Sequence, residues 1–219
     1  MPNILYSPLR QWGSALALAC GLLSGAPAQA TPPPANAASA ASAASATAWP
    51  GNSVYQLNAT LTDQDGKSFA WQRHSGKPVL LSMFYTSCKF VCPMLIDTMA
   101  LTQAALSPAQ RAQLDLLLIT FDPARDDVSK LHGVAQAHGL DTQQWTLART
   151  DSSSVRKIAA TLGIQYRLLA DGEFNHTTML VLLDGAGRIV ATTRKMGSAD
   201  PAFVQQLKQT LDAARPSAP

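Results

Sequence analysis

The hydrophobic pattern of this chain consists of short continuous apolar runs separated by segments with helical spacing. Continuous runs predict strands covered on both faces of a sheet, and they occur at residues 79–85, 114–121 and 178–184. Apolar stripes preceded by helix-starting residues predict helices from Pro93 to about residue 106, from Asp126 or Asp127 to His138, over residues 155–162, and from Asp200 to residue 211.

Two hairpins complete the predicted order of elements. Residues 54–62 alternate loosely between apolar and polar positions, and a turn at 63–66 leads into residues 67–71, which predicts an N-terminal β-hairpin. A short strand is expected at 145–148, and a glycine turn joins the run at 178–184 to a strand at 189–194. This order predicts an α/β fold, a three-layer sandwich whose central mixed sheet is flanked by helices.

The first 30 residues have the three parts of a secretory signal peptide. Arg10 is their only charged residue, an apolar run follows at 15–23, and Ala28-Gln29-Ala30 fits an A-x-A cleavage site. The run is short for a membrane span. Lipidation of Cys20 is the alternative, but the apolar run continues beyond that cysteine. We therefore expect cleavage near Ala30 and a periplasmic protein rather than a lipid-anchored one.

The remaining chain is predicted to hold one domain. Residues 31–48 contain Pro, Ala and Ser without charge and predict a disordered linker, followed by a domain at 49–214 and a tail at 215–219. Without residues 1–30, 16 Lys and Arg remain against 14 Asp and Glu. This near balance and the lack of a basic run exclude a nucleic-acid partner, and no second long apolar run predicts a membrane span. We expect a monomer.

The segment "FYTSCKFVCPMLIDTMA" carries Cys88 and Cys92 between a buried strand and a helix. A structural disulfide usually closes a longer loop, so this pair indicates chemistry. The start of a helix favours negative charge and lowers the pKa of a thiol, and Lys89 adds a positive charge. Both disulfide exchange and metal binding need such a thiolate, and a cysteine pair at this place is typical of thioredoxin-like proteins.

The spacing of the two cysteines favours metal binding over a disulfide without excluding the disulfide. Residues four apart on a helix have Cβ atoms about 5–6 Å apart, and a relaxed disulfide needs about 3.5–4.5 Å. His176 is the candidate third ligand, because the loop before a central strand should face the cysteines. His74, His132 and His138 are expected in a polar turn or in solvent. Two thiolates and an imidazole suit copper, whereas structural zinc would need a fourth ligand.

Three segments resemble the SCO/SenC family of copper-binding proteins that assist cytochrome c oxidase assembly: "FYTSCKFVCPM", "ITFDPARDD" and "NHTTMLVLLDGAGRIV". The resemblance implies a thioredoxin-like fold that binds one copper ion through Cys88, Cys92 and His176, with Asp122 near the metal. It also implies that the protein delivers copper to the binuclear copper site of the oxidase or to another periplasmic copper protein, or reduces the cysteines of that site.

This chain departs from the family pattern at three places. Lys89 and Phe90 stand where members often carry Pro and Asp, Asn175 replaces an acidic residue, and no membrane anchor is expected. These differences affect the expected partner protein and the expected membrane attachment more than the expected metal ligands.

Two classes of function follow from these residues. One is a metallochaperone, which binds copper without turnover. The other is an enzyme, a thiol–disulfide oxidoreductase of the thioredoxin type that acts on exported proteins with Cys88 and Cys92 as its redox pair. Such enzymes use CxxC and a proline in the facing loop, whereas residues 170–180 here contain no proline. A peroxidase is disfavoured because neither cysteine lies in a matching peroxide-site motif.

Overall fold

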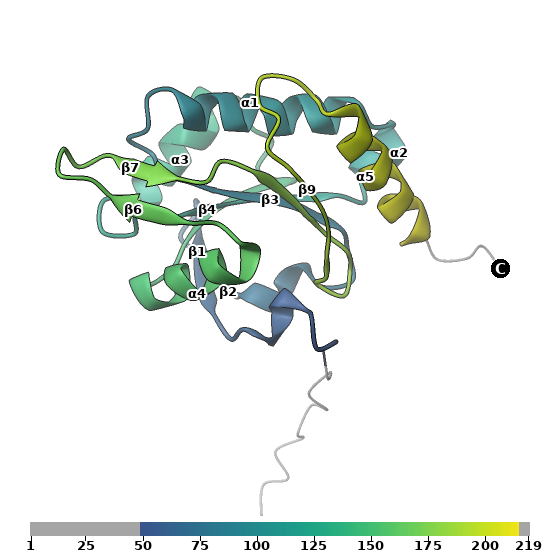
Figure 1. Cartoon of the computed structure of the whole chain (residues 1–219), viewed down its shortest axis with the longest axis horizontal. Helices are drawn as coiled ribbons and strands as arrows, with labels where there is room; N and C mark the ends of the chain where they lie inside the picture. Colours follow the sequence, from purple (N-terminus) through teal and green to yellow (C-terminus); the bar gives the residue numbers. More distant parts are fainter. Residues whose placement is uncertain (1–48, 215–219) are drawn as a thin grey trace, which may run out of the picture. The chain divides into compact units, whose positions relative to one another are not determined.

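The computed structural model describes residues 49–214. The predicted signal peptide, linker and tail, at residues 1–30, 31–48 and 215–219, lie outside these residues. The described part is built on a seven-stranded mixed sheet in the order β2-β1-β5-β4-β3-β8-β9. Helices α1, α3 and α5 lie along one face of this sheet and α4 along the other (Figure 1). The predicted three-layer α/β sandwich is confirmed.

The elements have the following bounds. The strands are β1 (Thr60–Asp63), β2 (Ser68–Ala70), β3 (Val79–Phe84), β4 (Asp115–Thr120), β5 (Trp145–Arg149), β6 (Tyr166–Leu168), β7 (Phe174–His176), β8 (Leu180–Leu183) and β9 (Ile189–Thr193). The helices are α1 (Val91–Ala104), α2 (Pro108–Arg111), α3 (Val128–Ala137), α4 (Ser152–Leu162) and α5 (Pro201–Ala213), with 3-10 turns η1 (Val54–Gln56) and η2 (Trp71–His74).

The centre of the sheet is parallel and its edges are antiparallel. β3, β4 and β5 run in one direction, β8 pairs antiparallel with β3, and β9 pairs antiparallel with β8. Right-handed crossovers from β3 to β4 and from β4 to β5 place α1 and α3 on the same face. All residues of β3 and β8 are buried, as their continuous apolar runs predicted.

The N-terminal hairpin forms as predicted but starts later than the pattern suggested. Leu61 pairs with Phe69 in an antiparallel ladder. The expected strand from residue 54 is wrong in its first part, because η1 occupies Val54–Gln56. Trp71 explains the difference, since its indole N–H donates to the Val54 carbonyl at 2.9 Å and fixes the turn over the core.

Two helices start two or three residues earlier than predicted. α1 begins at Val91 rather than at Pro93. α4 begins at Ser152 rather than at residue 155, because Asp151 accepts hydrogen bonds from the first backbone N–H groups. Of the two candidate caps of α3, Asp127 takes that role. The short helix α2 was not predicted.

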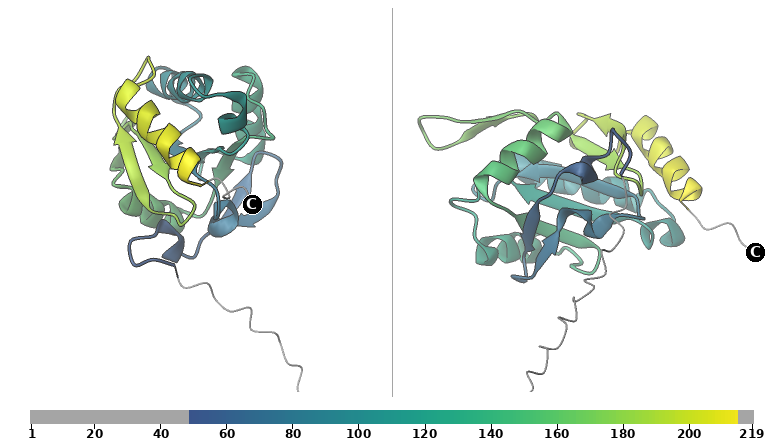
Figure 2. Two further views of the ribbon diagram at one scale, coloured as in Figure 1. Left: turned by 90° about the vertical axis from the view of Figure 1, so that its right-hand side faces the viewer. Right: turned by 90° about the horizontal axis from the view of Figure 1, so that it is seen from below.

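A second hairpin, β6–β7, was also not predicted. Its two strands have three residues each and form a separate two-stranded sheet. Strands this short give too little alternation for a sequence signal. The hairpin projects from the body beside the first turn of α1 (Figures 1 and 2). Within residues 49–214, no helix is both long enough and apolar enough to cross a bilayer.

Candidate metal centre

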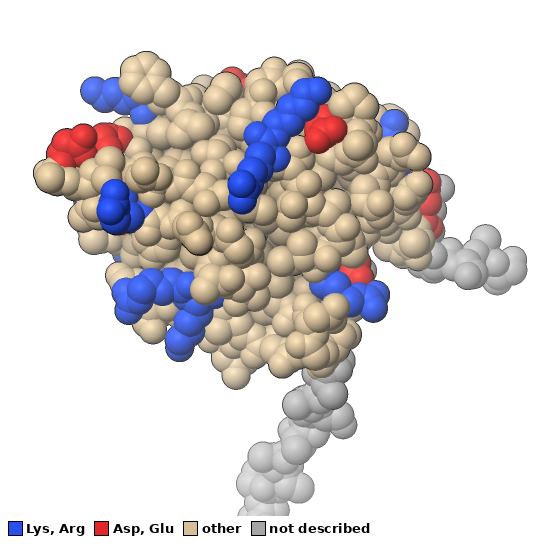
Figure 3. All heavy atoms as spheres, in the orientation of Figure 1, with Lys and Arg blue, Asp and Glu red and all other residues tan. Residues whose placement is uncertain are grey.

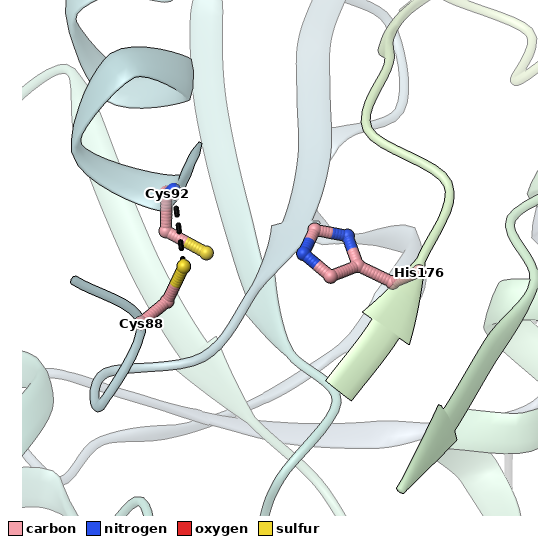
Figure 4. Close-up of side chains that lie close together, drawn as sticks. All are labelled: Cys88, Cys92 and His176. Atoms are coloured by element: carbon pink, nitrogen blue, oxygen red, sulfur yellow. Dashed lines mark hydrogen bonds between the residues drawn. The ribbon is translucent and has the colours of Figure 1, made fainter. Parts of the chain in front are cut away.

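The two cysteines lie at the junction between β3 and α1. Cys88 is in the turn after the strand, and Cys92 is in the first turn of the helix. Both side chains are buried and both thiols are free. The backbone N–H of Cys92 donates to the Cys88 sulfur at 3.3 Å (Figure 4). The turn thus points the Cys88 sulfur at the unpaired N–H groups of a helix start, where a thiolate is stabilised.

His176 completes the group from the other side. It is the last residue of β7, and its ring faces the two sulfurs (Figure 4). The candidate ligand atoms of Cys88, Cys92 and His176 all lie within 4.8 Å of one another. Cys92 and His176, which are 84 positions apart in the sequence, therefore lie close together, and the histidine faces the cysteines as the sequence predicted.

The surroundings shift the pKa values of the three groups in different directions. Burial by itself raises the pKa of Cys88, but hydrogen bonds from Cys92, from the Phe90 backbone and from the Tyr85 hydroxyl outweigh it and lower the pKa. The pKa of Cys92 is raised, mainly by burial and further by the neighbouring charge of Cys88. Burial also lowers the pKa of His176. The site thus combines a cysteine that ionises more readily than a free thiol, a second thiol that keeps its proton, and an imidazole that favours the neutral form, whose lone pair is available.

Tyr85 connects the cysteine turn to the hairpin that carries His176. Its hydroxyl donates to the Glu173 carboxylate at 2.6 Å and lies within hydrogen-bonding reach of Cys88. Burial raises the pKa of Tyr85, and its two anionic neighbours raise it further, so the hydroxyl keeps its proton. The ring also stands perpendicular to the His176 ring at 5.8 Å between centroids.

Aromatic packing holds the hairpin against the end of the sheet. Phe121, just after β4, lies 4.9 Å from His176, 5.0 Å from Phe174 and 5.3 Å from Tyr166, measured between ring centroids. Offset and edge-to-face pairs of this kind add to the stabilisation that burial provides. Phe121 therefore fixes both strands of the hairpin and the orientation of the imidazole.

A buried carboxylate fixes the start of the cysteine turn. Asp126 accepts hydrogen bonds from the Thr86 backbone N–H at 3.0 Å, from the Thr86 hydroxyl and from the Thr120 hydroxyl. Asp122, which the resemblance placed near the metal, instead accepts a hydrogen bond from Arg125. A role for Asp122 beside the metal stays a prediction, and Asp126 is the carboxylate that contacts the turn.

The other histidines have three different environments. His132 is exposed, as predicted. His74 is buried rather than placed in an open polar turn, because its Nδ1 lies 2.8 Å from the Asp115 carboxylate. His138 is less exposed than predicted, with 23% of its side chain accessible, and it lines a cavity of about 30 Å³ together with Cys88 and Cys92. A cavity of this size has room for a water molecule.

The donor set fits copper. A metal bonds to cysteine sulfur at about 2.3 Å and to histidine nitrogen at about 2.0 Å. Two donors on opposite sides of one ion are therefore at most about 4.6 Å apart, close to the separation within which the three atoms already lie. Thiolates combined with an imidazole favour copper over hard cations such as magnesium or calcium. Small side-chain rotations would let Cys88, Cys92 and His176 hold one ion.

Sequence reasoning missed Tyr85, Glu173 and Asp126. The position of Tyr85 at the end of an apolar run was a weak signal of a role in the site, since a buried hydroxyl needs a hydrogen-bond partner. The other two gave no usable signal, because their roles depend on how distant loops meet.

Comparison with known proteins agrees with this geometry. A model of the SCO1/SenC family matches residues 51–212. A curated protein of Stutzerimonas stutzeri, named "Putative copper-binding protein", is 35% identical over 71 residues, which are 32% of this chain and 35% of that protein. The match thus spans about a third of the length of the curated relative.

Solved structures of the same family share the fold. A SCO1/SenC family lipoprotein from Bacillus anthracis gives a TM-score of 0.64 at 21% identity, covering 70% of this chain and 93% of that chain. Yeast Sco1 with copper bound gives 0.61 at 19% identity, covering 74% and 90%. Since the family model spans nearly all the described residues, the chain belongs to the SCO1/SenC family, and it shares the thioredoxin-like fold of the solved Sco structures.

Proposed function

We propose that this protein is a periplasmic copper metallochaperone. It binds one copper ion through Cys88, Cys92 and His176 and passes it to the binuclear copper site of cytochrome c oxidase or to another periplasmic copper protein. The observation that carries the proposal is the convergence of two sulfurs and one imidazole nitrogen within 4.8 Å. The N-terminal sequence pattern supports export, and the protein acts as a monomer.

Each ligand contributes a different property to binding. Cys88 loses its proton more readily than a free thiol does, while Cys92 keeps its proton until the metal binds, so uptake of the metal is coupled to pH. Neutral His176 comes from a projecting hairpin and not from the body of the sheet. Three protein ligands leave a position for an incoming ligand, which a site for transfer requires and a closed four-ligand site would block.

A second activity is supported by the lowered pKa of Cys88. In a thiol–disulfide exchange, the Cys88 thiolate would attack a disulfide of the copper acceptor and form a mixed disulfide. Cys92 would then attack the Cys88 sulfur, leaving a Cys88–Cys92 disulfide here and two thiols on the acceptor. Both cysteines are free and adjacent, as this exchange needs. His176 occupies the facing position, which disfavours a general oxidoreductase.

Copper titration tests the proposal. The reduced mature protein, residues 31–219, is titrated anaerobically with Cu(I) against a competing chelator. We expect one tight equivalent, at least tenfold weaker binding in His176→Ala, and no change in the control His132→Ala, whose side chain is exposed on α3. Absence of a tight equivalent, or binding indifferent to His176, would refute the three-ligand site.

The reductase activity has its own test. Reduction of an oxidised copper-binding domain of the oxidase should be lost in Cys88→Ala and retained in His176→Ala. Loss in both variants would contradict a role that is separate from copper.

A further inference from the structure

The hairpin that carries His176 does not hold its own position. β6 and β7 have three residues each and form a separate two-stranded sheet. A two-stranded hairpin is marginally stable at best in water, so its contacts with the body decide where it lies. The cluster around Phe121 packs against its strands, while its turn at 169–173 projects beyond them (Figure 1). Whatever holds this turn therefore contributes to the position of His176.

Arg125 reaches the turn from the loop at 121–127, which joins β4 to α3. The central carbon of its guanidinium lies 5.4 Å from the centre of the Phe174 ring. One of its terminal nitrogens would lie 3.4 Å from a Cβ atom added at Gly172. A guanidinium beside an aromatic ring is attracted by the negative face of that ring. Arg125 thus contacts the hairpin both at its turn and on the strand that carries His176.

The loop anchors Arg125 to the body of the protein. Its Nε donates a hydrogen bond to the Asp122 carboxylate, whose side chain is only 7% exposed. The backbone N–H of Asp122 donates to the Thr120 hydroxyl at 3.0 Å, and Arg149 on β5 donates to the Pro123 carbonyl at 2.8 Å. The guanidinium is therefore bonded to a fixed carboxylate and also lies against the hairpin.

The charge of the turn favours the same contact. Asp171 and Glu173 stand on either side of Gly172 in the sequence, and the arginine side chain keeps its positive charge at any physiological pH. Figure 3 shows acidic and basic side chains near one another at the projecting end of the hairpin. Opposite charges at this place lower the free energy of the arrangement in which the turn lies against the loop.

We propose that Arg125 is a positioning residue of the copper site. With Asp122 as its anchor, it clamps the turn of the β6–β7 hairpin and keeps the imidazole of His176 facing the two sulfurs. Asp122 then acts on the site through Arg125 and not as a neighbour of the metal. This inference rests on the proposed function, since it concerns a ligand of that site.

The clamp controls how often His176 can leave the metal. A cation–π contact and an ion pair at this exposure together change an equilibrium by about fivefold. Loss of both should therefore raise the fraction of time that the hairpin spends away from the body by about fivefold. Copper that is held by His176 should be released faster by the same factor, because the ion leaves more readily once the imidazole has moved away.

Hydrogen–deuterium exchange of the reduced, metal-free protein tests the clamp without copper. In Arg125→Gln, the backbone N–H groups of residues 166–177 should exchange about fivefold faster than in the wild type. Those of β3 and β4 should not change. Arg125→Lys keeps a positive charge beside Phe174 and Asp122, so its hairpin should exchange more slowly than that of Arg125→Gln.

Arg73→Gln is the matched control. Arg73 pairs with Asp63 at 3.6 Å and lies over the Phe69 ring, so it repeats the contacts of Arg125 at the other end of the sheet. The two arginines are 40% and 38% exposed, and each carboxylate partner is 7% exposed. Arg73→Gln should leave the exchange of the hairpin as in the wild type.

Copper release tests whether the clamp acts through His176. The mature protein, residues 31–219, is loaded with one equivalent of Cu(I), and the rate of Cu(I) loss to an excess of chelator is measured. Arg125→Gln should release copper about fivefold faster than the wild type. In a His176→Ala background, the same substitution should change nothing further, because the ligand that it positions is absent.

Each other outcome has a definite meaning. If hairpin exchange is unchanged in Arg125→Gln, as fast in Arg125→Lys as in Arg125→Gln, or equally faster in Arg73→Gln, the clamp is overturned. Faster exchange in β3 and β4 as well would indicate general destabilisation and would also overturn it. If copper release is unchanged, or is accelerated equally without His176, Arg125 does not position that ligand. If the wild type binds no copper, the proposed function fails, while hydrogen exchange still decides the clamp.

Discussion

Removal of the Tyr85 hydroxyl tests how the cysteine turn and the hairpin are connected. Tyr85→Phe keeps the ring, so its packing against Phe121 and His176 is retained. It removes the hydroxyl that donates to Glu173 at 2.6 Å and that helps to lower the pKa of the nearby Cys88. The change therefore isolates one hydroxyl group from the aromatic cluster that surrounds it.

The expected magnitude follows from the lost hydrogen bond to Glu173. A hydrogen bond to a charged group contributes about 1.5–3 kcal/mol, but Glu173 is exposed and water can replace its partner, so a loss of about 1 kcal/mol in the free energy of unfolding is expected. The pKa of Cys88 should rise, because its thiolate loses one stabilising donor while those from Cys92 and Phe90 remain. At a fixed pH, less Cys88 is then ionised.

Alkylation and urea unfolding measure the two effects. The rate of Cys88 modification by iodoacetamide, followed by mass spectrometry across pH, should shift its midpoint to higher pH in Tyr85→Phe. Tyr166→Phe is the matched control, since that tyrosine stacks on Phe121 in the same cluster, and its Cys88 profile should match the wild type. An unchanged or lowered midpoint in Tyr85→Phe would refute the contribution of the Tyr85 hydroxyl to the lowered pKa of Cys88.

Two further carboxylates give independent predictions. Asp126→Asn should destabilise the protein by about 2 kcal/mol in urea unfolding, because the charged acceptor of the Thr86 and Thr120 donors is lost; a change below 0.5 kcal/mol would contradict that role. Burial works against ionisation of Asp115, but His74 outweighs it and lowers the pKa of the carboxyl below 3.8. The ionised Asp115 carboxylate therefore stabilises the folded state fully above pH 3.8, and this stabilisation is lost as the pH falls through the folded-state pKa. Asp115→Asn should accordingly be less stable than the wild type at pH 7. The difference in unfolding free energy between the two proteins should disappear in acid. A difference in stability that does not depend on pH would contradict the lowered pKa of Asp115.

The sequence by itself determined the frame of the fold and the grouping of three candidate metal ligands. Continuous apolar runs fixed β3, β4 and β8, because strands covered on both faces need apolar residues at every position. The order of strands and helices then implied a three-layer sandwich. In that fold the cysteine turn and the loop before β8 face each other, so Cys88, Cys92 and His176 could be grouped before any coordinates were known.

Only the tertiary structure decided which residues support that group. In the segment "DPARDD", the carboxylates of Asp122 and Asp126 contact different neighbours. Because of the path of the loop, Asp126 accepts the hydrogen bond from Thr86, whereas Asp122 accepts one from Arg125. Tyr85 and Glu173 are 88 positions apart and meet because the β6–β7 hairpin packs on Phe121. Such short strands are stable through long-range packing, which a local pattern of apolar and polar residues does not encode.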